Sequence, residues 1–263
     1  MNNSRILLVG CPRSGTTILQ AILSSHPKIF SLPETHFYPA LCSNIRMVRK
    51  LGISTKRAKL ILKRIESKYL KINKIKCSFF SNSLSLQYLN LLDTITAKRK
   101  YSVWLEKTPQ NLWFIGYIKS MSSDLKFLHI ERDPKDVIAS IHYASTKYPD
   151  SWGYANLDDA IQLCQESFII NNLYRDDNNH FYCKYNELIE SPNTVIKKIT
   201  NFLSIEMIND LHNCNVNKDD LIIEQNEVWK KSVSKGLKHT KSRFHSHFNN
   251  EQKSKVLEAI DNF

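Results

Sequence analysis

Eight consecutive residues near the N-terminus have the types and spacing of an anion-binding loop. The stretch Gly10-Cys11-Pro12-Arg13-Ser14-Gly15-Thr16-Thr17 follows an apolar run and precedes an amphipathic helical pattern. Its glycines are spaced as in the G-x-x-x-x-G-K-[ST] loop, whose backbone N–H groups surround a phosphate at a helix N-terminus. Arg13 adds positive charge, and Ser14, Thr16 and Thr17 add hydroxyl donors. The pattern predicts a site for a phosphate or sulfate group.

The same loop departs from the nucleotide triphosphatase pattern at one position. Thr16 stands where those enzymes have the lysine that contacts the β- and γ-phosphates. The substitution argues against ATP or GTP hydrolysis and favours a smaller anion. A glycine turn that only connects a strand to a helix is the plain structural alternative.

A second candidate anion site follows a later apolar run. Arg132 ends a predicted strand, and Ser140 comes two turns into the helix that Pro134 is expected to start. An arginine and a serine in these positions can converge on a terminal phosphate. A capped helix with Arg132 in a surface ion pair is the alternative explanation.

These stretches resemble one known family, the sulfotransferases that use 3′-phosphoadenosine 5′-phosphosulfate (PAPS). Residues 12–17 match the P-R-S-G-T-[ST] loop of the branch that includes protein-tyrosine and bacterial sulfotransferases. The similarity continues through residues 22–27 and Pro33-Glu34-Thr35-His36, where the tyrosine-sulfating enzymes carry a Glu-Thr pair. Arg132 and Ser140 match the R-[DN]-P-x-[DE]-x-x-x-S motif for the 3′-phosphate. The resemblance implies PAPS as donor, 3′-phosphoadenosine 5′-phosphate (PAP) as product, a hydroxyl acceptor and no metal ion.

The resemblance also implies roles in catalysis. Glu34 matches the catalytic glutamate of the tyrosine-sulfating enzymes, and partial desolvation would give it the raised pKa that a general base needs. His36 is the rival, because the intrinsic pKa of histidine suits the task. Lys107 matches the lysine of the family's K-[DT]-P stretch and would neutralise the leaving group together with Arg13.

Weaker signals extend the predicted cofactor site. Tyr185 resembles the tyrosine of the family's Y-E-x-L stretch, although the glutamate comes at residue 187 instead of directly after it. Lys231 and Lys235 fall where relatives have a lid over the cofactor. A basic loop in solvent explains these two lysines equally well.

Short β-branched runs alternate with longer helical patterns, which is typical of βαβ units around a parallel sheet. The sequence therefore predicts an α/β protein: a P-loop-type three-layer fold with a central parallel sheet flanked by helices, in one domain over residues 1–263. The predicted strands are Arg5–Val9, Lys28–Ser31, Tyr101–Leu105, Lys126–Ile130 and His180–Lys184. The predicted helices are Gly15–Ser25, Glu34–Ser43, Thr55–Ile72, Leu84–Lys98, Gln110–Met121, Pro134–Lys147, Leu157–Asp176, Pro192–Leu203 and Asn249–Asp261.

One helical stretch, between about residues 40 and 100, interrupts the βαβ rhythm and is expected to be a cap insertion that shapes the acceptor site. It is strongly basic, with twelve Lys or Arg and one acid, Glu66, from residue 44 to residue 76, in a chain of net charge +12. Such a segment suits a solvated helix face or an acidic acceptor. No zinc-finger, helix-turn-helix or RNP pattern favours nucleic acid.

Composition and chain ends add general expectations. The run Ile6–Gly10 starts too soon after Met1 for a signal peptide, so we expect a cytoplasmic protein. No apolar run approaches the roughly 18 residues that a spanning helix requires. Six scattered cysteines without a C-x-x-C pair indicate reduced thiols.

Two other functions remain open on the sequence. A phosphate-loop kinase of a small metabolite is disfavoured by Thr16 and by the lack of a magnesium-binding aspartate at a strand end. A non-catalytic module could keep the fold and bind a polyanion through residues 44–76. Within the sulfotransferase interpretation, no motif selects a glycan, a lipid, a tyrosyl peptide or a small alcohol as acceptor.

Overall fold

A five-stranded parallel sheet forms the centre of the computed structural model, which describes residues 4–42, 46–153, 156–208 and 242–263. The strand order is β2-β3-β1-β4-β5, and every neighbouring pair is parallel. The strands are β1 (Ser4–Val9), β2 (Ile29–Leu32), β3 (Val103–Lys107), β4 (Leu125–Glu131) and β5 (His180–Lys184). The predicted parallel sheet is confirmed.

The position of β1 in the middle of the sheet determines where a ligand can bind. Its neighbours β3 and β4 belong to the two halves of the sheet, so the chain winds first to one side of β1 and then to the other. In open α/β sheets, ligands bind at the carboxyl ends of the strands where the winding reverses. The loops after β1 and β4, which carry the two predicted anion sites, leave the sheet side by side at this edge.

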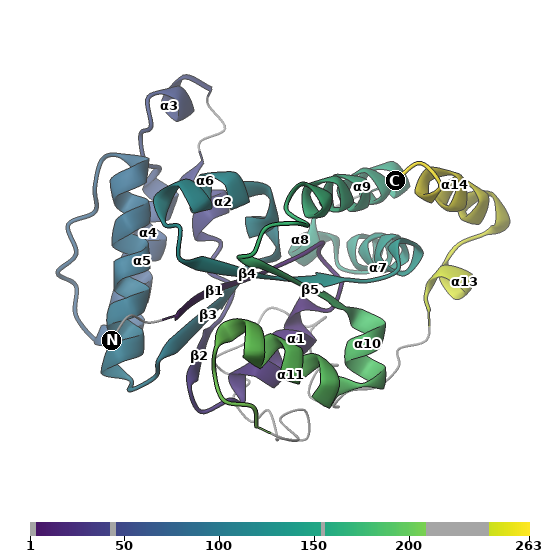
Figure 1. Cartoon of the computed structure of the whole chain (residues 1–263). Helices are drawn as coiled ribbons and strands as arrows, with labels where there is room; N and C mark the ends of the chain where they lie inside the picture. The colour runs from purple at the N-terminus through teal and green to yellow at the C-terminus, as the bar shows by residue number, and fades with distance from the viewer. Residues whose placement is uncertain (1–3, 43–45, 154–155, 209–241) are drawn as a thin grey trace.

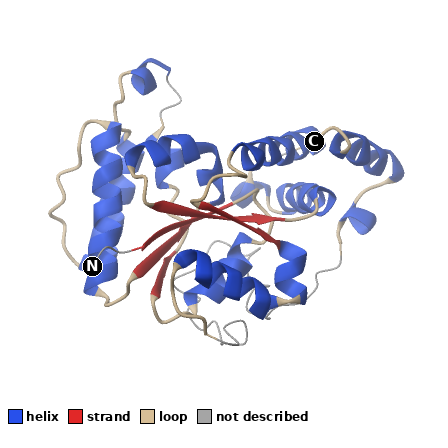
Figure 2. Cartoon of the chain, in the orientation of Figure 1, coloured by secondary structure: helices blue, strands red, loops and turns tan. Residues whose placement is uncertain are grey.

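Helices cover both faces of the sheet (Figure 1; Figure 2). One face carries α1 (Thr16–Ser24), α10 (Tyr185–Glu190) and α11 (Pro192–Leu203). The opposite face carries α2 (Phe37–Leu41), α4 (Lys56–Leu70), α5 (Ser81–Lys98), the 3₁₀ helix η1 (Pro109–Phe114) and α6 (Ile115–Met121). Beside them lie α7 (Pro134–Lys147), α8 (Pro149–Trp152), α9 (Leu157–Leu173), α13 (Phe244–His247) and α14 (Asn250–Ile260).

The strands are apolar almost throughout because both of their faces are buried. In β1, Ile6 and Leu8 pack against the α1 and α11 layer, whereas Leu7 and Val9 pack against the α2 to α6 layer. A third cluster joins Cys11 of the loop to α7, α9 and the C-terminal helices. This arrangement gives the three layers that the sequence predicted.

The predicted helices differ from the structure mainly at the site. The helix predicted to start at Glu34 begins at Phe37, so that prediction was wrong. Tertiary contacts keep this segment out of the helix, because Glu34 accepts a hydrogen bond from Lys107 and the next residue, Thr35, donates one to Glu106. The stretch predicted as one helix over Gln110–Met121 is divided into η1 and α6. The sequence missed α3 (Arg46–Lys50), α8, α10 and α13, which are too short to show a helical period.

The helical stretch between about residues 40 and 100 contains α3, α4 and α5, and its status as a cap insertion stays a prediction. The first turn of α4 is capped by Thr55, whose side chain accepts from the N–H of Ala58 at 3.0 Å. Leu84, Tyr88 and Leu92 of α5 are buried in the same cluster as residues of β1 and β3. Among the described residues, no helix is long and apolar enough to cross a membrane.

Candidate active site

The loop between β1 and α1 has the backbone conformation of an anion cradle. Gly10 and Gly15 have φ values of 154° and 111°, and Arg13 adopts a left-handed φ of 74°. A Cβ at Gly15 would lie 2.6 Å from the ring of Tyr185, and one at Gly10 would lie 2.9 Å from the carbonyl oxygen of Ile130. Only glycine fits these two positions, because both backbone freedom and space are needed.

The N-terminus of α1 is open toward this loop. Its N-cap residue is Gly15, and no side chain of the described residues caps the helix. The first backbone N–H groups of a helix have no partner within it, and the positive end of the helix dipole adds to their attraction for an anion. Thr16 and Thr17 begin the helix, so their N–H groups and hydroxyls are the donors nearest to a bound sulfate or phosphate.

A carboxylate, a lysine and a threonine meet at the carboxyl ends of β1, β2 and β3. Lys107, which is fully buried, donates from Nζ to the carboxylate of Glu34 and lies 3.4 Å from Oγ1 of Thr17. His36 Nε2 lies 3.4 Å from Glu34 Oε2, and its side chain is 40% exposed against 11% for Glu34. The structure thus brings together Glu34, Lys107 and Thr17, with His36 at the solvent side.

Glu106 positions this group from behind. Its buried carboxylate accepts hydrogen bonds from the N–H and the hydroxyl of Thr35, from the hydroxyl of Thr108 at 2.6 Å and from Asn111 at 2.7 Å. Burial raises the pKa of Glu106, while the hydrogen bonds from Thr108 and Thr35 oppose that rise. Because Thr35 follows Glu34 and Glu106 precedes Lys107, these bonds hold the base candidate and the lysine in register. Apart from the presence of an acid next to Lys107, no sequence pattern indicated this positioning role.

A second, arginine-rich group lies across the loop. Arg13 donates from Nε to Oγ of Ser140 at 3.2 Å, and Arg243 approaches the same oxygen at 3.5 Å. Burial, and next the positive charges of Arg243 and Arg132, lower the pKa of Arg13 to about 10. Such mutual repulsion means that an anion placed among the three guanidinium groups is strongly attracted.

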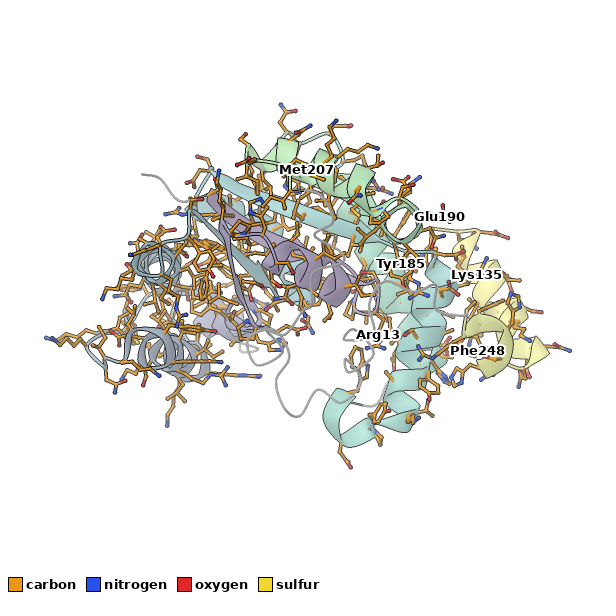
Figure 3. The ribbon with its side chains drawn as sticks, turned by 90° about the horizontal axis from the view of Figure 1, so that it is seen from below. Arg13, Lys135, Tyr185, Glu190, Met207 and Phe248 are labelled. Atoms are coloured by element: carbon orange, nitrogen blue, oxygen red, sulfur yellow. The ribbon has the colours of Figure 1, made fainter. Side chains whose placement is uncertain are left out.

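Arg132 reaches this group from the end of β4. Its guanidinium carbon lies 4.4 Å from the centre of the Tyr185 ring, and its side chain pairs with Asp136 at 3.5 Å. The side chain of Asp133 caps α7 by accepting from the N–H of Lys135 at 3.1 Å, which fixes the turn after Arg132. Figure 3 shows Tyr185 near Lys135 at the start of α7, Arg13 farther along that helix, and Phe248 where the C-terminal segment meets it.

A cavity of about 310 Å³ borders the arginine-rich group. Ser14, Arg132 and Tyr185, three of the predicted cofactor residues, line it together with residues of α9 and α10. The hydroxyls of Ser14 and Tyr185 are buried and have no hydrogen-bond partner among the described residues. Buried polar atoms without partners are rare in folded proteins and fit a polar ligand. The residues present therefore suit a polar ligand that carries negative charge.

The structure separates the predicted residues into two groups. Arg13 contacts Ser140 and lies 5.5 Å from the ring of Trp152, and its role beside the leaving group with Lys107 stays a prediction. Arg243 was missed, since it stands 103 residues after Ser140 and matches no motif that the sequence offered. Lys231 and Lys235 lie outside the described residues. Over the described ranges, no group of three or more His, Cys, Asp or Glu side chains could hold a metal ion.

Comparison with known proteins identifies the class of protein to which this fold and its two charged groups belong. The model of the sulfotransferase family matches residues 5–210, and the chain belongs to this family. The family and the fold support a sulfotransfer activity. The resemblance found in the sequence motifs is thereby confirmed.

Solved structures share the fold at low sequence identity. A sulfotransferase domain from the curacin biosynthetic pathway is 15% identical with a TM-score of 0.60, and the match covers 98% of both chains. A sulfotransferase domain of the Synechococcus PCC 7002 olefin synthase is 17% identical with a TM-score of 0.60, covering 98% of this chain and 94% of that one. Mouse sulfotransferase SULT7A1, solved with PAP, is 16% identical with a TM-score of 0.57, covering 98% and 84%.

A curated relative is similar over part of the chain. It is an uncharacterized protein of Aquifex aeolicus strain VF5, 26% identical over 136 residues, which are 51% of this chain. The match spans only 16% of that relative's length, so this chain corresponds to a small part of it.

Proposed function

We propose that the protein transfers a sulfuryl group from PAPS to a hydroxyl acceptor, with PAP as the product. The observation that supports this most directly is the contact of Lys107 with both Thr17 of the anion loop and Glu34. The same cation would then contact the leaving phosphate and the base that would activate the acceptor. Membership of the sulfotransferase family and the likeness to a structure solved with PAP agree with this assignment.

The two groups of the site fit the two ends of the donor. The N-terminus of α1, with Thr16 and Thr17, would hold the 5′-phosphosulfate through backbone N–H groups and hydroxyls. Arg132, Ser140 and Arg13 would hold the 3′-phosphate, with Arg243 as an additional ligand. The nucleoside would lie at the cavity lined by Ser14 and Tyr185, whose buried hydroxyls need partners. When bound, PAPS supplies the activated sulfuryl group.

The ion pair between Lys107 and Glu34 suggests how the base is controlled. A carboxylate that is held by a lysine is a poor proton acceptor, because the positive charge favours its ionised form. An anion at the loop competes for Lys107, which already lies 3.4 Å from Thr17 Oγ1. Lys107 then turns to the leaving oxygen, and the Glu34 carboxylate is free to accept the acceptor's proton.

His36 remains the competing base, and its position favours a supporting role. It touches Glu34 at 3.4 Å and is more exposed, so it can orient the carboxylate and relay a proton to solvent. Glu34 is the better candidate for the base because its carboxylate accepts a hydrogen bond from Nζ of Lys107 and is more buried than the His36 ring. The acceptor beyond its hydroxyl group stays open.

Binding and transfer experiments test the proposal in sequence. PAP is expected to raise the melting temperature of the protein, and ATP with magnesium is expected to leave it unchanged. Radiolabelled PAPS is then offered with panels of glycan, phenolic, lipid and small-alcohol acceptors, with Glu34→Gln as the inactive control. Stabilisation by ATP with magnesium and no response to PAP would overturn the proposal in favour of a kinase.

A further inference from the structure

Large apolar side chains are exposed at one end of the basic segment. Of the nine large hydrophobic residues that are exposed in the described part of the chain, six lie between Met47 and Leu86. Five of them are between 57% and 69% exposed: Leu60 of α4, and Met47, Leu51, Phe79 and Phe80. Scattered single exposures are ordinary, but a contiguous patch indicates an interaction surface.

Met47, Leu51, Phe79 and Phe80 lie in two segments that contact each other, residues 47–53 and 79–81. We call these four side chains the apolar tip. The N–H of Leu51 bonds the carbonyl of Met47 at 3.0 Å. Ile53 forms an antiparallel bridge with Phe80, and the rings of Phe79 and Phe80 meet edge to face at 5.5 Å. Figure 1 shows α3, which carries Met47, projecting from the body of the molecule next to the ends of α4 and α5. The tip is therefore a protrusion and not a groove.

Residues 44–76, which include part of the tip, are strongly basic. The only acid from residue 44 to residue 76 is Glu66, against twelve Lys or Arg. Glu66 is buried, and its carboxylate accepts from the N–H groups of Lys74 and Ile75 at 3.1 and 3.0 Å. The exposed cations near the tip in the chain include Arg49, Lys50, Lys56, Arg57 and Lys76. Their charges are thus left for a partner.

We propose that the apolar tip and the cations around it bind the surface of a membrane that contains anionic lipids. Aromatic and aliphatic side chains enter the boundary between headgroups and acyl chains, while Lys and Arg contact anionic headgroups. A lipid surface fits a protruding apolar tip beside a strongly basic segment, because it offers negative charge in a plane above an apolar interior. Long cationic side chains can hold their charges at the headgroups while their stems cover apolar surface.

The tip is connected to the active-site segment through α2. The hydroxyl of Thr55, at the start of α4, donates to the carbonyl oxygen of Ala40 in α2 at 2.5 Å. Because α2 begins directly after His36, the tip is joined through one short helix to the segment that carries Glu34. Binding through the tip is a property separate from sulfuryl transfer and does not depend on it.

Vesicle co-sedimentation of the full chain tests the proposal. The protein is expected to bind vesicles of phosphatidylcholine and phosphatidylglycerol in equal amounts, and to bind pure phosphatidylcholine vesicles much more weakly. Phe79→Ser with Phe80→Ser should lower the partition coefficient by about tenfold or more, because two exposed rings no longer enter the lipid. Lys56→Gln with Arg57→Gln should lower it by about fivefold for each charge.

Two matched double variants control for composition and charge. Ile169→Ser with Leu173→Ser removes two exposed apolar side chains from α9, and Lys197→Gln with Lys198→Gln removes two exposed cations from α11. Both should bind vesicles like the unchanged protein. All four variants should keep the melting temperature and the PAP affinity, which reports separately on the proposed function.

Three outcomes would overturn the proposal. The first is no sedimentation with the anionic vesicles, and the second is equal loss in the tip variants and their controls. The third is a dimer in gel filtration that Phe79→Ser with Phe80→Ser dissociates, without vesicle binding, which would assign the tip to a second copy of the chain. Retained PAP binding in any of these cases would leave the sulfotransferase proposal standing.

Discussion

The two charged groups at the edge of the sheet differ in how their charges are balanced. In the group of Glu34 and Lys107, one buried cation faces one carboxylate. In the group around Ser140, the guanidinium groups of Arg13, Arg132 and Arg243 lie close enough together to lower the pKa of Arg13, and Arg132 also pairs with Asp136. In the first group the cation is already paired with a carboxylate before a ligand arrives, whereas the guanidinium groups of the second group repel one another.

This difference indicates that the two groups have different roles, one in binding and one in the reaction. Unbalanced cations gain most from a permanent anion, so the arginine group suits a phosphate that stays unchanged during the reaction. A balanced pair can exchange partners at little electrostatic cost, so Lys107 and Glu34 suit the place where charge moves. Variants of the first group should therefore affect turnover, and variants of the second should affect affinity.

The largest expected effect is on the base. Glu34→Gln should lower kcat by about 10²–10⁴-fold, since the amide cannot accept the acceptor's proton. PAP affinity should change little, because Glu34 is not expected to touch the cofactor. Steady-state kinetics on a labelled acceptor give the first value and calorimetry gives the second. His36→Gln is the matched variant, and a loss of kcat as large as that of Glu34→Gln would transfer the role of base to His36.

Lys107 should come next. Lys107→Met keeps the length of the side chain but removes the charge, and kcat should fall by about 10²–10³-fold as the leaving oxygen loses its cation. Lys126→Met makes the same change at a partly buried strand lysine that bonds the carbonyl of Phe202. That control should keep full activity. A drop in PAP affinity as large as the drop in kcat would make Lys107 a binding residue. The two groups would then not differ in their effects on turnover and affinity.

The arginine group should show the opposite pattern. Arg132→Ala should weaken PAP binding by roughly 1.5–3 kcal/mol, the range for a lost hydrogen bond to a charged group. AMP, which lacks the 3′-phosphate, should bind the variant and the unchanged protein almost equally in calorimetry. Arg175→Ala, which removes a nearby surface arginine paired with Glu131 at 2.5 Å, is the control. Equal losses for PAP and AMP would refute the 3′-phosphate assignment.

The smallest effect concerns pH. The pKa of Arg13 is lowered to about 10 by burial and by the neighbouring arginines. A bound anion favours the charged guanidinium, so PAP affinity should be constant below this pKa and fall as the pH rises through it. Arg243→Gln removes one cause of the shift and should move the fall to higher pH. An unchanged midpoint in calorimetry across the alkaline range would show that Arg243 does not act on Arg13.

Local patterns predicted the strands and the anion loop well because both depend on neighbours in the chain. The strand predicted over His180–Lys184 has these bounds in the structure, and Gly10 and Gly15 have the positive φ values that a glycine loop requires. The start of the helix after β2 was wrong because contacts from β3, 71 to 73 residues away, hold Glu34 and Thr35 outside it. Helical periodicity cannot report such contacts.

The sequence by itself determined the class of protein. Three features indicated it: an apolar strand, the glycine loop after it that lacks the triphosphatase lysine, and a second motif with Arg132 and Ser140. These signals are local, since a loop needs its glycines and a strand its apolar residues wherever they meet. Only the tertiary structure decided the partners. The strand order brings Lys107 to Glu34 and Thr17. Packing against α7 places Arg13 and Arg243 at Ser140. Convergence of charges depends on packing between layers, and no spacing along one chain specifies it.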